Sequence, residues 1–217
     1  MLWGVPAWEG ESSNSMIAII NSGIANVRSV QKGFEREGFP ARIIEDPGDL
    51  DGAGGAVLPG VGAFRRGMDY LREKGFLEPL QRWIESGKPL LGICLGFQLL
   101  CAESEEFGLH RGLNIFPGRV RRFPPGLKVP HMGWNSIRRE RKIPLLQGIP
   151  DGSYFYFVHS YFLDSPDPAV VAGTTEYGIS FPSVICRDNV YATQFHPEKS
   201  QRLGLRILSN FGGLVRW

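Results

Sequence analysis

The feature that most constrains the fold is an apolar strand that runs directly into a helix at a cysteine between two glycines. Residues 89–93 are apolar throughout, and residues 95–103 show the spacing of a helix. A strand without polar positions is typical of a parallel sheet that is covered on both faces. A strand that passes at once into a helix is the repeating unit of such sheets. We therefore expect an α/β fold around this point of the chain.

The remainder of the first half repeats this alternation. Short apolar runs predict strands at residues 16–20, 42–44 and 56–58. The last of these runs is ended by Pro59 and Gly60. Helical spacing and a closing glycine predict helices at residues 27–38 and 71–86. This order predicts a three-layer α/β domain in which helices cover both faces of a mostly parallel sheet.

The second half of the chain is dominated by strand patterns with short turns between them. They cover residues 119–123, 154–158, 170–174, 183–186 and 190–195. Such closely spaced strands predict an antiparallel extension of the same sheet. A final helix is expected from residue 200 to about residue 211. We expect one domain over residues 16–217, with residues 1–15 as an extension outside the core.

Composition and charge exclude several other classes of protein. Hydrophobic residues make up 42% and charged residues 21% of the chain, and the net charge is +2, so a globular protein without a nucleic-acid surface is expected. No apolar run reaches the roughly 18 residues that a membrane span needs, and the first fifteen residues lack the features of a secretory signal. Three cysteines without a paired pattern indicate a reducing compartment, and we expect a cytoplasmic protein with no metal site and no cofactor.

The turn at Cys94 has the pattern of a nucleophile elbow. Gly92-Ile93-Cys94-Leu95-Gly96 follows the Gly-x-nucleophile-x-Gly order that presents a side chain above a sheet. The start of a helix carries unpaired N–H groups and partial positive charge, which favour a thiolate over a thiol. The N–H of Leu95 is placed to bind an oxyanion. Cys101 and Cys186 lack glycine neighbours, and we expect both to pack in the core.

A cysteine nucleophile needs a base, and the base needs a group that orients it. His196 follows the strand predicted at residues 190–195, and strand ends are where α/β sheets present functional groups. Glu198 comes two residues later, and Pro197 between them fixes the turn. Together with the elbow, these residues predict a Cys94–His196–Glu198 triad in an amide hydrolase.

These motifs resemble the class I glutamine amidotransferases. The family signature is a Gly-x-Cys-x-Gly elbow continued by a glutamine, here Gln98, and a His-x-Glu near the C-terminus. Three further segments resemble one branch of the family. They are residues 59–64 (Pro-Gly-Val-Gly-Ala-Phe), 131–135 (His-Met-Gly-Trp-Asn) and 157–161 (Phe-Val-His-Ser-Tyr). The segment Asn-Ser-Gly-Ile-Ala-Asn at residues 21–26 departs from that branch, which usually carries Asp-Tyr-Gly-x-Gly-Asn.

The resemblance implies a flavodoxin-like fold and the hydrolysis of glutamine to glutamate and ammonia through a cysteine thioester. It implies that the oxyanion is held by the N–H of Leu95 and by an N–H of the strand at Gly60 and Val61. That second peptide is expected to rest with its carbonyl facing the site until it flips. The residues that match family positions around glutamine are Gly62, Gln98, Glu106, Ser160 and Tyr161.

The branch also implies a partner. Its glutaminase is a separate chain that passes ammonia to a (β/α)8-barrel cyclase of histidine biosynthesis, giving a heterodimer. The products implied are imidazole glycerol phosphate and an aminoimidazole carboxamide ribonucleotide. The positions that match partner-facing residues are Asn26, Trp134, Asn135, Tyr156 and Lys199.

Three alternatives compete with this interpretation. A glutaminase of the pyridoxal phosphate or anthranilate type is disfavoured by the segments at residues 59–62 and 131–135. A stand-alone cysteine peptidase or chaperone-like hydrolase gives no reason for Gln98 or for Glu198 directly after Pro197. A non-catalytic interaction module is disfavoured by the complete triad.

Overall fold

The computed structural model describes residues 16–21, 26–164 and 166–215. The expected extension at residues 1–15 and most of the turn at residues 21–26 lie outside these ranges. The helices are α1 (Val27–Arg36), α2 (Phe64–Glu73), α3 (Leu77–Glu85), α4 (Leu95–Leu99) and α5 (Gln201–Gly212). Short 3₁₀ helices are η1 (Pro47–Leu50), η2 (Pro144–Leu146), η3 (Pro168–Val170) and η4 (Pro197–Lys199).

The central sheet has eight strands in the order β2-β1-β3-β4-β14-β13-β12-β9. Its parallel strands are β1 (Ile17–Ile20), β2 (Ala41–Ile44), β3 (Gly55–Gly60), β4 (Leu90–Cys94) and β14 (Val190–Thr193). The antiparallel strands are β13 (Ser180–Arg187), β12 (Val171–Glu176) and β9 (Arg138–Arg139). This confirms the expected mostly parallel sheet with an antiparallel extension.

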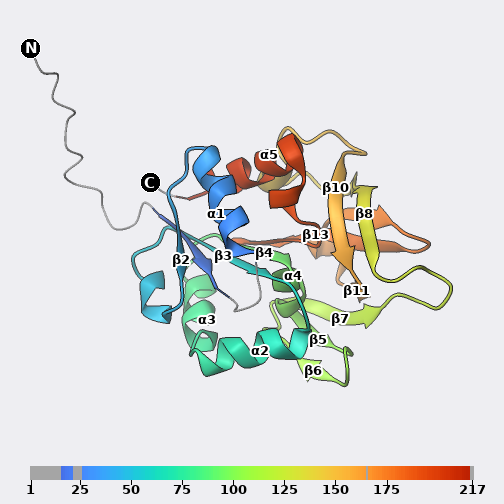
Figure 1. The fold of residues 1–217 in the computed structure, drawn as a ribbon, viewed down its shortest axis with the longest axis horizontal. Coiled ribbons are helices and arrows are strands. Elements are labelled where there is room, and N and C mark those ends of the chain that lie inside the picture. Colours follow the sequence, from blue (N-terminus) through green and yellow to red (C-terminus); the bar gives the residue numbers. More distant parts are fainter. Residues whose placement is uncertain (1–15, 22–25, 165, 216–217) are drawn as a thin grey trace, which may run out of the picture.

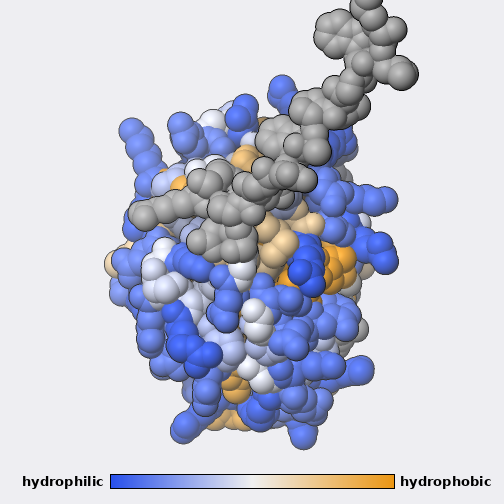
Figure 2. Space-filling model, turned by 90° about the vertical axis from the view of Figure 1, so that its left-hand side faces the viewer, coloured by the Kyte–Doolittle hydropathy of each residue, from blue (hydrophilic) through white to orange (hydrophobic). Residues whose placement is uncertain are grey.

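Helices cover both faces of the sheet, as Figure 1 shows. Ile17 and Ile19 of β1 pack in the same core as Phe34 of α1 and Phe211 of α5. The alternate β1 residues belong to a second core with α2, α3 and α4. Because strand side chains alternate between faces, one short apolar strand serves both layers. The face of the molecule in Figure 2 is mostly hydrophilic, with small apolar patches.

The prediction of a single helix over residues 71–86 is wrong. The structure has two helices there, the end of α2 and the whole of α3. Gly75 lies between them with φ +74°. The N–H of Phe76 bonds the carbonyl of Leu71 at 2.8 Å, and the N–H of Gly75 bonds that of Arg72 at 3.1 Å. A left-handed glycine with this bonding ends a helix, and the buried side chain of Phe76 holds the break in place.

The helix expected over residues 95–103 is also shorter than predicted. α4 ends at Leu99, and the chain continues as strand β5 (Cys101–Ser104). The carbonyls of Leu99, Leu100 and Cys101 accept hydrogen bonds from the N–H groups of residues 113–116. These tertiary bonds compete with helix continuation, and local helical spacing does not reveal them.

Two of the five strands expected to extend the sheet belong elsewhere. Residues 119–123 lie largely in β7 (Phe116–Arg122), in a separate four-stranded sheet with β5, β6 (His110–Arg111) and β11 (Tyr161–Asp164). Residues 154–158 lie in β10 (Tyr154–His159), which pairs only with β8 (His131–Ser136) among the described residues. A smaller correction concerns Pro59 and Gly60, which do not stop the strand before them: they are the last two residues of β3 and pair with Ile93 and Cys94 of β4.

Candidate active site

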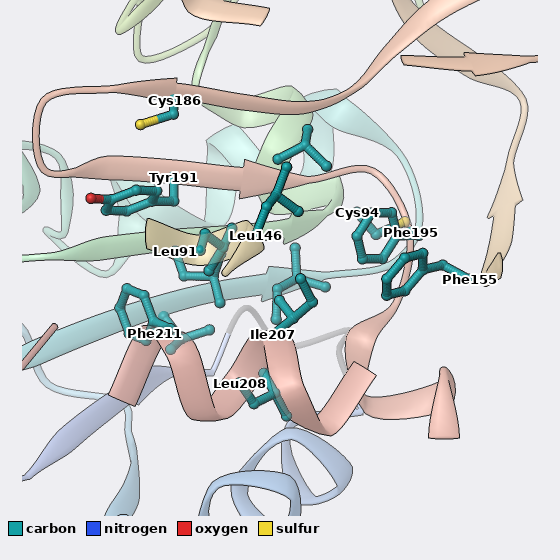
Figure 3. Close-up of a cluster of buried hydrophobic side chains, with 14 of the residues drawn as sticks. Leu91, Cys94, Leu146, Phe155, Cys186, Tyr191, Phe195, Ile207, Leu208 and Phe211 are labelled. Atoms are coloured by element: carbon teal, nitrogen blue, oxygen red, sulfur yellow. The ribbon is translucent and has the colours of Figure 1, made fainter. Parts of the chain in front are cut away.

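Cys94 stands at a sharp turn between β4 and α4. Its backbone has φ 54° and ψ −104°, a conformation that residues other than glycine rarely adopt. A Cβ atom at Gly96 would lie 1.7 Å from the carbonyl oxygen of Leu58, and one at Gly92 would lie 2.9 Å from the carbonyl oxygen of Gly96. The turn therefore requires both glycines. Its cysteine lies at the edge of the core, near Phe195 and Phe155 (Figure 3).

The thiol of Cys94 has polar neighbours although only 6% of the residue is exposed. The amide Nε2 of Gln194 donates toward Sγ at 3.9 Å, and the carbonyl of Val158 lies 3.9 Å from Sγ. Gln194 is fully buried directly after β14. Sequence reasoning missed this residue, although a glutamine inside an apolar run was a usable signal.

His196 and Glu198 lie together just beyond the end of β14. Nδ1 of His196 is 2.8 Å from Oε1 of Glu198, and both side chains are 3% exposed. Pro197 opens η4 and brings Glu198 back to the imidazole. The hydroxyl of Ser200 holds the backbone by donating to the carbonyl of His196 at 2.6 Å and accepting the N–H of Tyr156 at 2.9 Å. The base and its orienting carboxylate are thus fixed from several elements.

The electrostatic environment of His196 favours its charged form. Burial alone penalises the imidazolium, but the charge of Cys94 and then that of Glu198 outweigh this penalty and raise the pKa of His196 to about 10. Nε2 is buried and makes no hydrogen bond of ordinary geometry within the described residues. The neighbouring Cys94 and Glu198 therefore hold the pKa of His196 well above the usual range of an imidazole.

A pocket of about 490 Å³ opens above Cys94. It is lined by all five residues expected to surround glutamine, namely Gly62, Gln98, Glu106, Ser160 and Tyr161. Leu95 and Val61 also line it, and the rim includes Phe107, which is 85% exposed. Its volume falls in the usual range of about 300–1,000 Å³ for small-molecule sites.

Two polar side chains of this pocket are held in fixed positions. Oε2 of Glu106 accepts the N–H of Phe64, the first residue of α2, at 2.6 Å. Nε2 of Gln98 donates to the carbonyl of Tyr161 at 3.1 Å and to Oε1 of Gln194 at 3.2 Å. Neither residue is therefore a freely solvated side chain.

His196 and Glu198 do not line this pocket. They border a separate void of about 10 Å³, together with Pro59, Gly60 and Val61. Asn26 and Lys199, two of the expected partner-facing residues, also line the void. The void therefore has in its lining both the proposed base and two residues expected to face a partner.

The other expected interface residues divide between two faces of the two-stranded β8–β10 sheet. Trp134 is 46% exposed and meets Tyr156 edge to face at 6.2 Å. Nζ of Lys199 lies 5.8 Å from the ring centroid of Tyr156. Asn135 is instead turned inward, and its Nδ2 donates to the carbonyl of Glu176 at 2.9 Å. The structure thus groups Trp134, Tyr156 and Lys199 on one surface, without Asn135.

Two further histidines are buried beside the pocket. His131 is 3% and His159 6% exposed. Burial lowers the pKa of His131 to about 4, and burial with the nearby His131 and His196 lowers the pKa of His159 to about 3. Both imidazoles are therefore neutral at neutral pH.

These low pKa values predict an acid-sensitive fold. In the unfolded chain each histidine binds a proton near pH 6.5, whereas in the folded protein His131 does so only near pH 4. The contribution of the neutral imidazole to the free energy of unfolding is therefore complete above pH 6.5 and is lost as the pH falls to about 4. Between these pH values, each such histidine lowers the free energy of unfolding by up to about 1.4 kcal/mol per pH unit. Urea unfolding at several pH values should show a shallower decline for His131→Phe than for wild type. Equal slopes would contradict the assignment.

The described residues contain no group of three or more His, Cys, Asp or Glu side chains arranged to hold a metal ion. No helix in the described ranges is both long and apolar enough to cross a membrane. Cys101 and Cys186 are free and buried, as expected for core residues.

The fold and the cysteine elbow are those of the glutamine amidotransferases, and similarity to known proteins agrees. Residues 19–213 match the family described as glutamine amidotransferase class-I. The chain belongs to this family of glutamine-hydrolysing enzymes. Within it, the chain groups with the subunits called HisH of imidazole glycerol phosphate synthase.

Two of these relatives illustrate the similarity. The HisH subunit of Syntrophotalea carbinolica is 58% identical over 206 residues, covering 92% of this chain and 100% of the relative. The HisH subunit of Geobacter sulfurreducens is 53% identical over 203 residues, covering 90% of this chain and 97% of the relative.

Solved structures agree on the fold at lower identity. A crystal structure of a glutamine amidotransferase aligns with a TM-score of 0.72 at 20% identity, covering 91% of this chain and 98% of that one. A putative GMP synthase protein from Thermoplasma acidophilum aligns with a TM-score of 0.69 at 22% identity, covering 92% of each chain.

Proposed function

We propose that Cys94, His196 and Glu198 hydrolyse glutamine in the pocket above Cys94, and that the ammonia passes to a cyclase subunit. The observation that carries the proposal is the arrangement of a cysteine elbow beside a buried His–Glu pair. Residues 16–217 form the functional domain in this proposal, residues 1–15 lie outside it, and the protein works in the cytoplasm. The family membership supplies the substrate class, and the relatives named HisH suggest the partner.

The raised pKa of His196 favours transfer of the Cys94 thiol proton to its imidazole as the chemistry starts. The Cys94 sulfur attacks the side-chain amide carbon of glutamine, and the tetrahedral intermediate collapses when His196 protonates the departing ammonia. Water then attacks the glutamyl thioester while His196 takes its proton, and glutamate is released as that proton returns to the leaving sulfur and regenerates the thiol. Glu198 keeps the imidazole oriented and stabilises its positive charge throughout.

The walls of the pocket fit the polar groups of glutamine. The carboxylate of Glu106, held by the N–H of Phe64, suits an α-ammonium group. Gly62, Ser160 and Tyr161 line the same pocket, and we assign them to the rest of the amino-acid end. Gln98 fixes the wall at Tyr161 by holding the carbonyl of that residue.

Ammonia has a short way out toward the surface. The void beside His196 measures about 10 Å³, close to the space that one water-sized molecule needs. Its lining includes the catalytic candidate His196 and the surface residues Asn26 and Lys199. A partner seated over Asn26 and Lys199 would receive ammonia before it reached bulk solvent.

The surface next to this exit suits a protein partner. Met132, Trp134 and Tyr154 are 62%, 46% and 58% exposed on neighbouring strands. Clustered exposed apolar side chains are typical of protein–protein contacts. We assign this face, with Tyr156 and Lys199, to a (β/α)8 cyclase that makes imidazole glycerol phosphate and aminoimidazole carboxamide ribonucleotide. Asn135 faces inward and would act on this contact only indirectly.

The proposal is tested by measuring ammonia release from glutamine with the chain alone, with the cyclase, and with the cyclase plus its nucleotide ligand. We expect hydrolysis in the complex and co-purification of the two proteins. A complex that forms but leaves glutamine intact would refute the glutaminase function. Hydrolysis without any association would refute the partner.

The same assay tests a gate at the oxyanion site. The N–H of Leu95 supplies one donor, and β3 ends at Gly60 directly beside Cys94. Gly62, one residue past Val61, has φ +98° and gives this segment the freedom to flip. We expect the chain alone to be about 10²–10³-fold slower than the liganded complex, the usual loss for one missing oxyanion donor.

The partner can drive the flip only through contacts that differ between the two states. Asn26, Lys199 and Val61 border the same void, so a protein seated on the first two reaches the third. Equal kcat for the chain alone, the complex and the liganded complex would show that the oxyanion site is already complete.

A further inference from the structure

The two buried histidines outside the proposed triad form a hydrogen-bonded pair. His131 opens β8, His159 ends β10, and the strand register sets them opposite each other. Nδ1 of His131 is 2.9 Å from Nε2 of His159. Aromatic rings surround the pair, with Tyr177 stacked on His131 at 4.1 Å and Phe123 at 5.2 Å from His159. Polar groups buried this deeply need hydrogen bonds to offset the loss of water.

The outer end of the pair is fixed by Asn135. Its Oδ1 accepts the N–H of Ser136 at 2.8 Å, and its Nδ2 donates to the carbonyl of Glu176 at 2.9 Å. The second Nδ2 hydrogen points to Nε2 of His131 at 3.2 Å. Nε2 of His131 must therefore accept, so its proton is on Nδ1 and is donated to His159.

The inner end of the pair leads independently to the same assignment. Nδ1 of His159 is 2.7 Å from the carbonyl oxygen of Tyr161. A carbonyl can only accept, so His159 carries its proton on Nδ1 and accepts at Nε2. One proton on each ring satisfies every bond. A second proton on either ring would set two hydrogens against each other.

The series of hydrogen bonds continues to the nucleophile. The carbonyl of Tyr161 also accepts Nε2 of Gln98, and the same Nε2 donates to Oε1 of Gln194. Nε2 of Gln194 in turn donates toward Sγ of Cys94. The carbonyl of Tyr161 is thus held by two buried donors, one from each side.

We propose that His131 and His159 are positioning residues for glutamine binding, which hold the carbonyl of Tyr161 and through it Gln98. This inference rests on the proposed glutaminase function. Tyr161 and Ser160 form the pocket wall, so a rotated carbonyl at Tyr161 displaces that wall and releases Gln98. Neither His131 nor His159 takes part in the proposed bond-making steps. The effect therefore falls on glutamine binding more than on turnover.

The outer end of the series lies on the strand that carries Trp134. Asn135 follows Trp134 directly and points to the opposite face of β8. A partner that shifts β8 would therefore move Asn135 and the imidazole bonded to it. The histidine pair connects the proposed docking face with the glutamine pocket.

The test uses His131→Phe in the complex with the cyclase. Phenylalanine keeps the ring volume and the stacking on Tyr177 but removes the hydrogen that His159 accepts. We expect the KM for glutamine to rise about tenfold, which corresponds to about 1.4 kcal/mol, while kcat changes less than about threefold. His131→Asn should restore most of the affinity, because its Nδ2 can take the place of Nδ1.

Phe123→Leu is the matched control. Phe123 packs on His159 and lies 6.2 Å from His131, but its side chain donates no hydrogen bond. This variant should lower stability and leave the KM unchanged. An unchanged KM in His131→Phe, or an equal rise in Phe123→Leu, would overturn the proposal.

Nitrogen-15 NMR of the wild-type chain gives a readout that is independent of activity. Both imidazoles should appear as the Nδ1–H tautomer at neutral pH, and an Nε2–H tautomer at His131 or His159 would overturn the assignment. A wild-type complex that does not hydrolyse glutamine would instead refute the proposed function, while the tautomers would still decide the hydrogen-bond series.

Discussion

Replacing Cys94 with alanine is expected to abolish glutamine hydrolysis and to leave the fold intact. Loss of a nucleophile in comparable triads lowers kcat by about 10⁶-fold. The elbow should survive, because Gly96 must approach Leu58 and Gly92 must approach Gly96 whatever residue stands between them. Alanine also adopts φ 54° at about the same cost as cysteine, since both carry a Cβ.

The measurement is steady-state ammonia release by the complex of Cys94→Ala with the cyclase. Added ammonium salts should still support the synthase reaction, because that chemistry belongs to the partner. Cys101→Ala is the matched control, since Cys101 is fully buried but lies in β5 away from the pocket lining. It should cost roughly 1 kcal/mol of stability and keep the glutaminase activity. Turnover of glutamine by pure Cys94→Ala would sink the nucleophile assignment.

Local signals explain why the parallel half of the fold could be predicted from sequence. Apolar strands such as Leu90–Cys94 have no polar face, and only a sheet covered on both sides accommodates them. The glycines around Cys94 lie within five residues, so the elbow pattern is visible without knowledge of distant contacts. Its catalytic role remains a prediction, which the variants above test.

Contacts between distant residues explain the errors. Helical spacing over residues 71–86 could not show that Gly75 adopts a left-handed conformation. The strand β5 forms because the backbone of residues 99–101 makes hydrogen bonds to residues 113–116. The pattern of apolar residues within 95–103 gives no sign of these distant hydrogen bonds. Strand patterns likewise do not reveal which of several sheets a strand such as β7 or β10 joins.

The polar environment of the site was hidden for the same reason. Gln194 and Gln98 lie 96 residues apart in the chain but 3.2 Å apart in space. His131 and His159 are 28 residues apart and bond directly. Sequence motifs identified the segments that carry Gln98, His131 and His159, but not Gln194. The hydrogen bonds among them depend on how β8, β10, α4 and β14 meet.

The second large effect is expected from the imidazole. His196→Ala should lower kcat by about 10⁶-fold, as seen for the base of a comparable triad. Glu198→Gln should cost less, because it removes a charge that orients and stabilises the imidazolium but transfers no proton. The negative charge of Glu198 raises the pKa of His196. Its loss should therefore lower that pKa and move the alkaline decline of glutamine turnover to lower pH.

Glu140→Gln provides the control for this shift, since Glu140 pairs with Arg138 on the surface and does not touch His196. Its pH profile should match that of wild type. An unshifted pH profile in Glu198→Gln would show that the 2.8 Å contact between Glu198 and His196 does not raise the pKa of His196.

The double variant of Cys94 and His196 decides whether the two residues act as one unit. Without Cys94, no tetrahedral intermediate forms for His196 to protonate. Without His196, attack by Cys94 lacks a group to take the thiol proton and an acid for the leaving ammonia. Removing both should therefore cost about as much as removing either alone. The measurement is kcat for glutamine in the two single variants and the double variant, all as complexes with the cyclase. If the two losses multiply in the double variant, Cys94 and His196 contribute independently, and the triad hypothesis is wrong.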